Sequence, residues 1–281
     1  VQVQQFVRVH LAHAGTDPLE RVPAMQLTDE VTFEVPEAGI AVITIARPAQ
    51  RNAINAGVIE GLRQAWLRLE DDASLKVGIL TGSGDKAFCA GMDLKAAPAM
   101  KLKVPPRDMF PVLGDVVQIS KPTIAAVNGA ALAGGWLFAQ MCDLCIAADH
   151  ATFGITEAKV GRGMPWAAPL IHMLPQRVMM EVLLTGLPIS AQRALALGYV
   201  NDVVPLADLM TRALEMARGI AANAPLTVKA ARELVYLSTE MGRSAGLRAA
   251  HHLFESVYLS DDAQEGPLAF SEKRAPRWTG R

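Results

Sequence analysis

The sequence predicts an α/β protein with a mostly parallel sheet, followed by a helical C-terminal region. Short apolar segments alternate with helical patterns from Val31 to about residue 205, and only helical patterns follow from Ala207. Half of the 281 residues (51%) are hydrophobic, so the chain can bury a sizeable core and wholesale disorder is excluded. We therefore divide the chain into an N-terminal extension (1–30), a core (31–205) and a helical region (206–281).

The first half of the core alternates strands with one helix. Residues 1–30 show no clear period, whereas Ile40–Ala46 reads as a buried strand that stops before Arg47-Pro48. Between Asn55 and Asp72 an amphipathic helix is predicted. Its apolar face carries Val58, Leu62, Ala65, Trp66 and Leu69. Val77–Thr81 is a second buried strand, which runs into a glycine turn.

The second half continues the alternation after a loop predicted for Lys95–Arg107, which is rich in Ala, Pro and Lys. We expect strands at Thr123–Val127, Cys142–Ala148 and Val200–Val204, and helices at Gly134–Met141 and Ser190–Leu197. Ser190 is suited to cap the second of these helices, and Gly198 to end it. Further helices are expected at about 207–222, 226–241, 245–258 and 261–273.

Charge and composition exclude several classes of protein. The 27 Lys and Arg residues nearly balance the 28 Asp and Glu residues, so no global attraction to nucleic acid or anionic membranes is expected. The uncharged stretch between Lys121 and Asp143 is long enough for a membrane span, but Asn128-Gly129 and Gly134-Gly135 interrupt it. Three cysteines and an N-terminus without a continuous apolar segment favour a cytoplasmic protein without a disulfide framework.

Some motifs match chemistry that their context does not support. The segment from Gly242 to Gly246 fits the pattern of a nucleophile elbow around Ser244, but helical sequence precedes it and no histidine follows His252. Cys142 and Cys145 would face opposite sides of a strand. The histidines show no metal-ligand spacing. We therefore expect neither a catalytic serine nor a metal site.

Three glycine-containing segments point to a site. They read KAFCAGMDL (residues 86–94), PTIAAVNGAALAGG (122–135) and ATFGITEAKVGRG (151–163). Gly134-Gly135, at a predicted strand-to-helix junction, exposes backbone N–H groups at the positive end of a helix, where a developing negative charge is stabilised. Gly91-Met92 could supply a second N–H. Two converging amides form an oxyanion hole.

In order and spacing, these segments resemble those of the crotonase (enoyl-CoA hydratase/isomerase) superfamily. Residues 47–55, RPAQRNAIN, also resemble the first CoA-binding segment of that family, and the resemblance extends from about Val31 to residues 272–274. It implies a crotonase-like spiral of ββα units followed by a helical trimerisation region, and therefore a homotrimer or a dimer of trimers. It also implies an acyl-CoA thioester as substrate, with coenzyme A as part of that substrate and no separate cofactor.

The resemblance assigns roles to individual residues. The thioester oxygen would lie between the N–H groups of Met92 and Gly134. Further contacts with substrate or CoA are expected from Arg51, Ala53, Ala90, Asp93, Leu94 and Leu137, and from Phe270 and Lys273, which match a C-terminal segment that reaches the CoA. Trp166 is expected to line the acyl pocket, with an ordinary core position as the alternative.

Glu157 is the expected acid–base group. It lies four residues after Phe153 and matches the family glutamate that transfers a proton to or from the α-carbon. By the same resemblance, Leu137 occupies the position of the second glutamate of the family hydratases. Leucine can neither accept a proton nor orient water. Loss of one acid–base group typically costs about 10²–10⁴-fold in rate. With one carboxylate, the sequence favours double-bond isomerisation of an enoyl-CoA.

Other reactions stay open at this stage. Glu157 alone could support hydration or dehydration, and lyase chemistry of the hydroxycinnamoyl-CoA hydratase-lyase kind or thioester hydrolysis is a further alternative. A non-enzymatic relative that binds a CoA thioester or RNA is the rival class. Glu157 opposes a loss of catalysis, because an idle buried carboxylate costs stability unless it is paired. The near-neutral charge opposes RNA binding.

Overall fold

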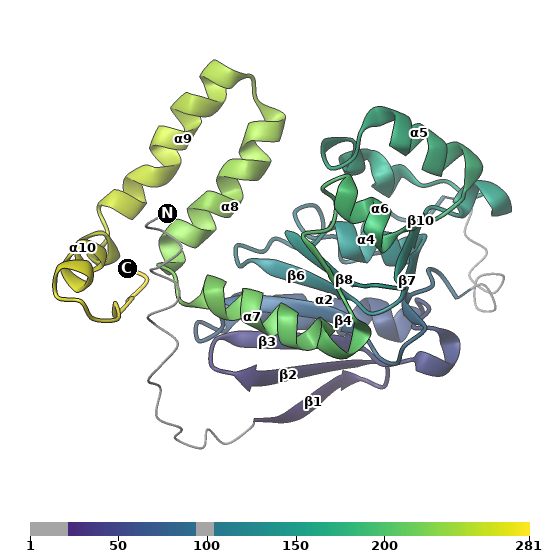
Figure 1. The fold of residues 1–281 in the computed structure, drawn as a ribbon, viewed down its shortest axis with the longest axis horizontal. Coiled ribbons are helices and arrows are strands. Elements are labelled where there is room, and N and C mark those ends of the chain that lie inside the picture. Colours follow the sequence, from purple (N-terminus) through teal and green to yellow (C-terminus); the bar gives the residue numbers. More distant parts are fainter. Residues whose placement is uncertain (1–21, 94–103) are drawn as a thin grey trace.

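The computed structural model describes residues 22–93 and 104–281. In this part of the chain, two β-sheets form the centre and helices cover them (Figure 1). The larger sheet has the order β1-β2-β3-β4-β6-β8-β11, with the bounds Val22–Thr28, Val31–Glu37, Ile40–Ile45, Val77–Gly82, Thr123–Val127, Leu144–Ala148 and Asp202–Val204. The smaller sheet has the order β10-β9-β7-β5, with the bounds Ile189–Ser190, Thr152–Gly154, Ala130–Leu132 and Ala87–Cys89.

The larger sheet is parallel through most of its width. Strands β1, β2 and β3 form an antiparallel meander, and β3, β4, β6, β8 and β11 then pair in parallel. Every residue of β4 and β6 is buried, as is typical of parallel strands that are covered on both faces. The predicted strands at Ile40–Ala46, Val77–Thr81 and Thr123–Val127 are therefore confirmed.

The chain visits the two sheets in turn. Strand β4 of the larger sheet leads to β5 of the smaller one, β6 leads to β7, and β8 leads to β9. Helix α4 (Gly134–Gln140) follows the second of these pairs. Because each pair advances by one position in both sheets, the chain forms a spiral of ββ and ββα turns. The predicted α/β spiral is thus confirmed.

Helices pack on both faces of the larger sheet. Helix α2 (Ala56–Asp71) contacts β1, β2 and β3, and buries the apolar face that the sequence predicts. The side chain of Asn55 caps it by accepting a hydrogen bond of 2.9 Å from the N–H of Val58. Helix α7 (Leu209–Ala221) covers β3, β4, β6 and β8 through Leu209, Ala213 and Ala217.

The C-terminal helices extend away from this body (Figure 1). Helices α8 (Pro225–Glu240) and α9 (Arg243–Tyr258) pack against each other, and α10 (Asp261–Ser271) follows at the end of the molecule. None of the residues of α9 is buried. The four helices expected after residue 207 are confirmed to within a few residues.

Several elements lie where none was predicted. Strand β1 falls within residues 1–30 and pairs with β2 through its backbone, while its side chain Met25 stays 43% exposed. The strands of the smaller sheet have two or three residues, which is too short to show a period. Helix α5 (Gln176–Thr185) buries only Met179 and Val182. The loop predicted from Lys95 lies largely outside the described residues.

The uncharged stretch after Lys121 is divided among β6, β7 and α4. Within the described part of the chain, no helix is both long and apolar enough to cross a bilayer.

Candidate functional site

The site begins where β7 turns into α4. Ala133 makes this turn with φ = 52° and ψ = −124°, a conformation that residues other than glycine seldom adopt. Helix α4 then starts at Gly134, whose N–H has no partner within the helix because it belongs to the first turn. A Cβ on Gly135 would lie 1.9 Å from the carbonyl oxygen of Cys89. Glycine at 135 therefore lets the start of α4 pack against the end of β5.

The segment around Met92 lies against this helix start. Gly91 has φ = 86°, and a Cβ on it would lie 2.8 Å from the Cβ of Ala133 and 3.5 Å from the nitrogen of Gly134. The N–H of Ile54 donates to the carbonyl of Gly91 (2.8 Å), and the N–H of residue 93 donates to the carbonyl of Ile54 (2.9 Å). In such a parallel bridge, the N–H of Met92 points away from Ile54.

The two predicted oxyanion-hole donors are thus adjacent in space. Met92 and Gly134 come from segments about 40 residues apart, and two close glycine contacts bring their backbones together. Within residues 22–93 and 104–281, neither N–H donates to a backbone acceptor. Two such amides can hold an oxygen that develops negative charge.

Glu157 follows the next strand of the smaller sheet. Strand β9 pairs with β7, so that the N–H of Ala133 donates to the carbonyl of Gly154 (2.8 Å). Glu157 begins a short 3₁₀ helix three residues later and is only 8% exposed. Its Oε1 accepts a hydrogen bond of 3.2 Å from the indole N–H of Trp166, and its Oε2 is buried without a partner in the described structure.

Burial raises the pKa of the Glu157 carboxyl, and the hydrogen bond from Trp166 opposes this rise. A carboxyl with a raised pKa is a better proton donor and acceptor near neutral pH than an ordinary glutamate. Glu157 can therefore accept and donate a proton at the end of the strand that pairs with β7.

The two other predicted side chains at this end of the molecule differ in burial. Leu137 is 1% exposed and belongs to the main apolar core. Trp166, at the start of a 3₁₀ helix (Pro165–His172), is partly buried against the same core and reaches Glu157. Trp136 is fully buried, and its ring centroid lies 5.7 Å from that of Phe153 and 5.6 Å from that of Tyr199.

The residues expected to bind CoA through their backbones form one group. The N–H of Ala90 donates to the carbonyl of Arg51 (3.1 Å). The guanidinium of Arg47 donates to the carbonyl of Ala53 and, at 3.2 Å, to the carboxylate of Asp93. Arg51, Ala53, Ala90 and Asp93 are therefore brought together beside Met92. Leu94 lies outside the described residues.

Two buried asparagines that were not predicted as site residues, Asn52 and Asn128, support this group. The Asn52 amide donates to the carbonyls of Ser83 (2.9 Å) and Ala87 (2.7 Å), and the Asn128 amide donates to that of Gly84 (2.8 Å). They fix the loop between β4 and β5. A hollow beside it is lined by Pro48, Arg51, Asn52 and residues 83–87. The pair Asn128-Gly129 reads only as a turn in the sequence.

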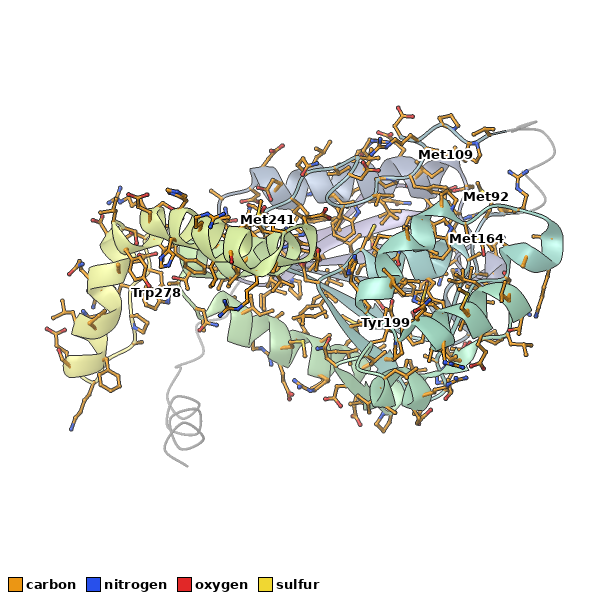
Figure 2. All side chains as sticks on the ribbon, turned by 90° about the horizontal axis from the view of Figure 1, so that it is seen from above. Met92, Met109, Met164, Tyr199, Met241 and Trp278 are labelled. Atoms are coloured by element: carbon orange, nitrogen blue, oxygen red, sulfur yellow. The ribbon has the colours of Figure 1, made fainter. Side chains whose placement is uncertain are left out.

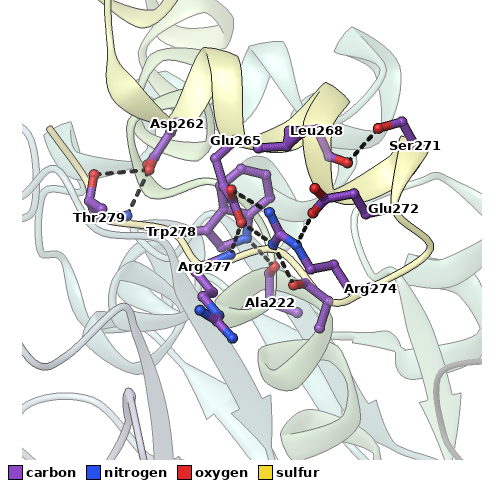
Figure 3. A network of polar contacts seen from close by, with 11 residues as sticks. Ala222, Asp262, Glu265, Leu268, Ser271, Glu272, Arg274, Arg277, Trp278 and Thr279 are labelled. Carbon is purple, nitrogen blue, oxygen red and sulfur yellow. Dashed lines mark hydrogen bonds and ion pairs between the residues drawn. The ribbon is translucent and has the colours of Figure 1, made fainter.

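Phe270 and Lys273 lie elsewhere in the single chain. They stand at the end of α10, at the opposite end of the molecule from Met92 (Figures 1 and 2), and Phe270 is 67% exposed. The following tail folds back on α10 (Figure 3). Arg274 pairs with Glu265, and the indole N–H of Trp278 donates to the carbonyl of Ala222 (2.7 Å). Figure 3 shows that the tail is joined to α10 and to Ala222 by these hydrogen bonds and ion pairs.

The motifs that were set aside take structural positions. Ser244 lies in the first turn of α9, directly after α8, so no strand precedes it. Cys142 and Cys145 are buried free thiols, and burial raises the pKa of both. Among the described residues, no three His, Cys, Asp or Glu side chains are grouped as metal ligands would be.

Comparison with known proteins identifies the family. The family model described as enoyl-CoA hydratase/isomerase matches residues 36–281. A carnitinyl-CoA dehydratase of Proteus mirabilis is 38% identical over 250 residues, covering 85% of this chain and 94% of the relative. An (E)-benzylidenesuccinyl-CoA hydratase of Thauera aromatica is 38% identical over 261 residues, covering 89% of this chain and 99% of the relative.

Solved structures agree with these matches. An enoyl-CoA hydratase from Mycobacterium tuberculosis has a TM-score of 0.83 and 39% identity, and the match covers 90% of this chain and 99% of the other. An enoyl-CoA hydratase from Mycobacterium marinum has a TM-score of 0.82 and 40% identity, with the same coverage. The family model spans well over half of the chain, and the relatives match nearly their whole length. The chain therefore belongs to the enoyl-CoA hydratase/isomerase family, the crotonase superfamily.

Proposed function

We propose that the chain moves a proton at the α-carbon of an acyl-CoA thioester, with Glu157 as the single acid–base group. One observation carries this proposal: a buried carboxylate with one unpartnered oxygen follows strand β9, which pairs with the strand that leads to Gly134, and the backbones of Gly134 and Met92 are adjacent. The thioester carbonyl oxygen would accept hydrogen bonds from both amides. Coenzyme A enters as part of the substrate, and no further cofactor takes part.

The proton transfer follows from this geometry. The ionised Glu157 removes a proton from the α-carbon, and the electrons of that C–H bond form the enolate, whose oxygen takes the negative charge. Each amide that meets this oxygen contributes about 10²–10³-fold in rate. Protonated Glu157 can then return the proton to carbon or give it to a leaving group.

We propose addition or removal of water as the net reaction, because two relatives that are 38% identical carry the names dehydratase and hydratase. In dehydration, Glu157 takes the α-proton and passes it to the departing β-hydroxyl, which leaves as water. In hydration, Glu157 takes a proton from water as the water oxygen adds to the β-carbon, and delivers that proton to the α-carbon. One carboxylate carries the proton in both directions.

Double-bond isomerisation is the second candidate, and Leu137 favours it. This side chain is 1% exposed and apolar, and it stands where the family hydratases have a glutamate that activates water. Without that group, water is held less well, whereas a proton shuttle between two carbons needs only Glu157. Hydration by one carboxylate is accordingly expected to be about 10²–10⁴-fold slower than with two.

The test supplies (E)-2-butenoyl-CoA and 3-butenoyl-CoA separately in heavy water, and follows ultraviolet absorbance and product mass. A water adduct of the first compound supports hydration, and a conjugated thioester formed from the second supports isomerisation. Glu157→Gln should abolish either reaction and keep CoA affinity. Glu60→Gln, which changes an exposed glutamate of α2, is the matched control. Turnover that survives in Glu157→Gln would contradict the proposal.

We also propose that the chain assembles as a homotrimer or a dimer of trimers. Two observations support this. Helix α9 buries none of its residues in the single chain. Apolar side chains are exposed on α8, α9 and α10, among them Val235 (64%), Leu247 (51%) and Phe270 (67%). Assembly could bring Phe270 and Lys273 to the CoA of a neighbouring subunit, and sedimentation equilibrium measures the mass of the assembly.

A further inference from the structure

Trp166 makes the one side-chain hydrogen bond to Glu157 that the structure shows. The indole N–H lies 3.2 Å from Oε1, while Oε2 is buried and has no partner among the described residues. The two carboxylate oxygens therefore differ. Oε1 accepts a hydrogen bond from an indole that does not ionise near neutral pH, and Oε2 is the oxygen left to take up a proton.

Trp166 is in turn tied to α4. The side-chain amide of Gln140 donates a hydrogen bond of 2.6 Å to the backbone carbonyl of Trp166. Gln140 is the last residue of α4 and is 6% exposed, so this bond lies in a mostly dry environment. Because α4 begins at Gly134, a single short helix connects the oxyanion-hole amide with the residue that holds the carboxylate.

We propose that Trp166 is a positioning residue for Glu157: it fixes Oε1, leaves Oε2 as the oxygen that carries the proton, and is itself held by Gln140. This deepens the proposed function and rests on the acid–base role of Glu157. The indole does not touch the reacting carbon in this assignment. It sets where the carboxylate points relative to the amides of Met92 and Gly134.

The hydrogen bond also affects ionisation of the carboxylate. Burial raises the pKa of Glu157, whereas the indole N–H and the backbone amides of residues 156 and 157 lower it. Burial and hydrogen bonds, rather than a neighbouring charge, set the direction of this shift. Removal of the indole donor should therefore raise the pKa further, since the ionised form loses a hydrogen bond.

The test compares the wild type with Trp166→Phe, which keeps a ring and removes the donor. Loss of a hydrogen bond to a charged group should weaken ionisation about ten-fold or more, which raises the pKa by about one unit. The acid limb of the kcat profile with (E)-2-butenoyl-CoA should move to higher pH, with kcat falling more than KM changes. Gln140→Leu should shift the limb in the same direction by less.

Trp278→Phe is the matched control, since it also removes an indole hydrogen bond but lies at the other end of the molecule (Figure 2). It should leave the acid limb unchanged. A second readout does not need turnover: carbon-13 NMR of labelled glutamate carboxyls follows the titration of Glu157, which is assigned with Glu157→Gln. An unchanged titration in a folded Trp166→Phe protein overturns the inference. Activity retained by Glu157→Gln would instead overturn the proposed function.

Discussion

Substitution of Gly91 by alanine should separate the two amides of the oxyanion hole. The added Cβ would lie 2.8 Å from the Cβ of Ala133 and 3.0 Å from the carbonyl oxygen of Leu132, closer than such atoms pack. The first of these atoms is bonded directly to the main chain and the second belongs to it, so neither can rotate away. The clash can be removed only if the backbone at Met92 or Gly134 moves. The positive φ of 86° adds about 1–2 kcal/mol of strain for a residue with a Cβ.

The magnitude follows from the loss of one donor. An oxyanion hole with one misplaced amide is expected to lose about 10²–10³-fold in kcat. Gly198→Ala is the matched control, because Gly198 has a φ of 80° and an added Cβ would meet nothing within 4 Å. It should lose about 1–2 kcal/mol of stability from strain and keep its kcat. Thermal unfolding and steady-state kinetics measure both quantities. A Gly91→Ala protein whose kcat stays within a few-fold of the wild-type value would refute the assignment of Met92 and Gly134 as the oxyanion hole.

Three further outcomes are expected. Burial raises the pKa of Glu157, so the ionised form of this side chain should be lost at a higher pH than that of an ordinary glutamate as the pH falls. A pH profile of kcat/KM with its acid limb at 4.5 or below would contradict this. Arg232→Met should destabilise the protein by about 1.5–3 kcal/mol in urea unfolding, because half-buried Asp143 loses its ion pair at 2.8 Å and keeps only the hydrogen bonds from Thr123 and Tyr236; a loss under about 0.5 kcal/mol would oppose this. Asn52→Ala should lower the free energy of unfolding by about 2–4 kcal/mol, because the carbonyls of Ser83 and Ala87 lose a donor and alanine must keep the left-handed φ of 55° at this position. An unchanged midpoint of thermal unfolding would argue against this anchoring role of Asn52.

Much of the fold could be predicted because its strands and helices are strongly patterned. The strand at Thr123–Val127 is buried on both faces, so an apolar β-branched run marks it in the sequence as in the structure. Helix α2 buries the stripe that its period predicts. The strands of the smaller sheet are too short for any period, and β1 is held by backbone pairing that leaves little trace in its side chains.

The site was only partly predictable for a different reason. Glycine motifs and the resemblance to the family indicated Met92, Gly134 and Glu157, but spacing in the sequence cannot show that segments 40 residues apart converge. Contacts such as a Cβ of Gly91 against Ala133 depend on tertiary packing. The hydrogen bond from Trp166 to Glu157 joins two 3₁₀ helices, whose relative placement no local pattern specifies.

Deuterium exchange at the α-carbon of a saturated acyl-CoA tests the account most directly. Butanoyl-CoA can neither add water nor isomerise, so exchange of its α-protons in heavy water reports proton transfer through the enolate alone. The account predicts that the wild type incorporates deuterium, that Glu157→Gln does not, and that both bind the thioester. Equal exchange by the two proteins, or a wild type that binds butanoyl-CoA without exchange, would contradict the assignment of Glu157 as the acid–base group.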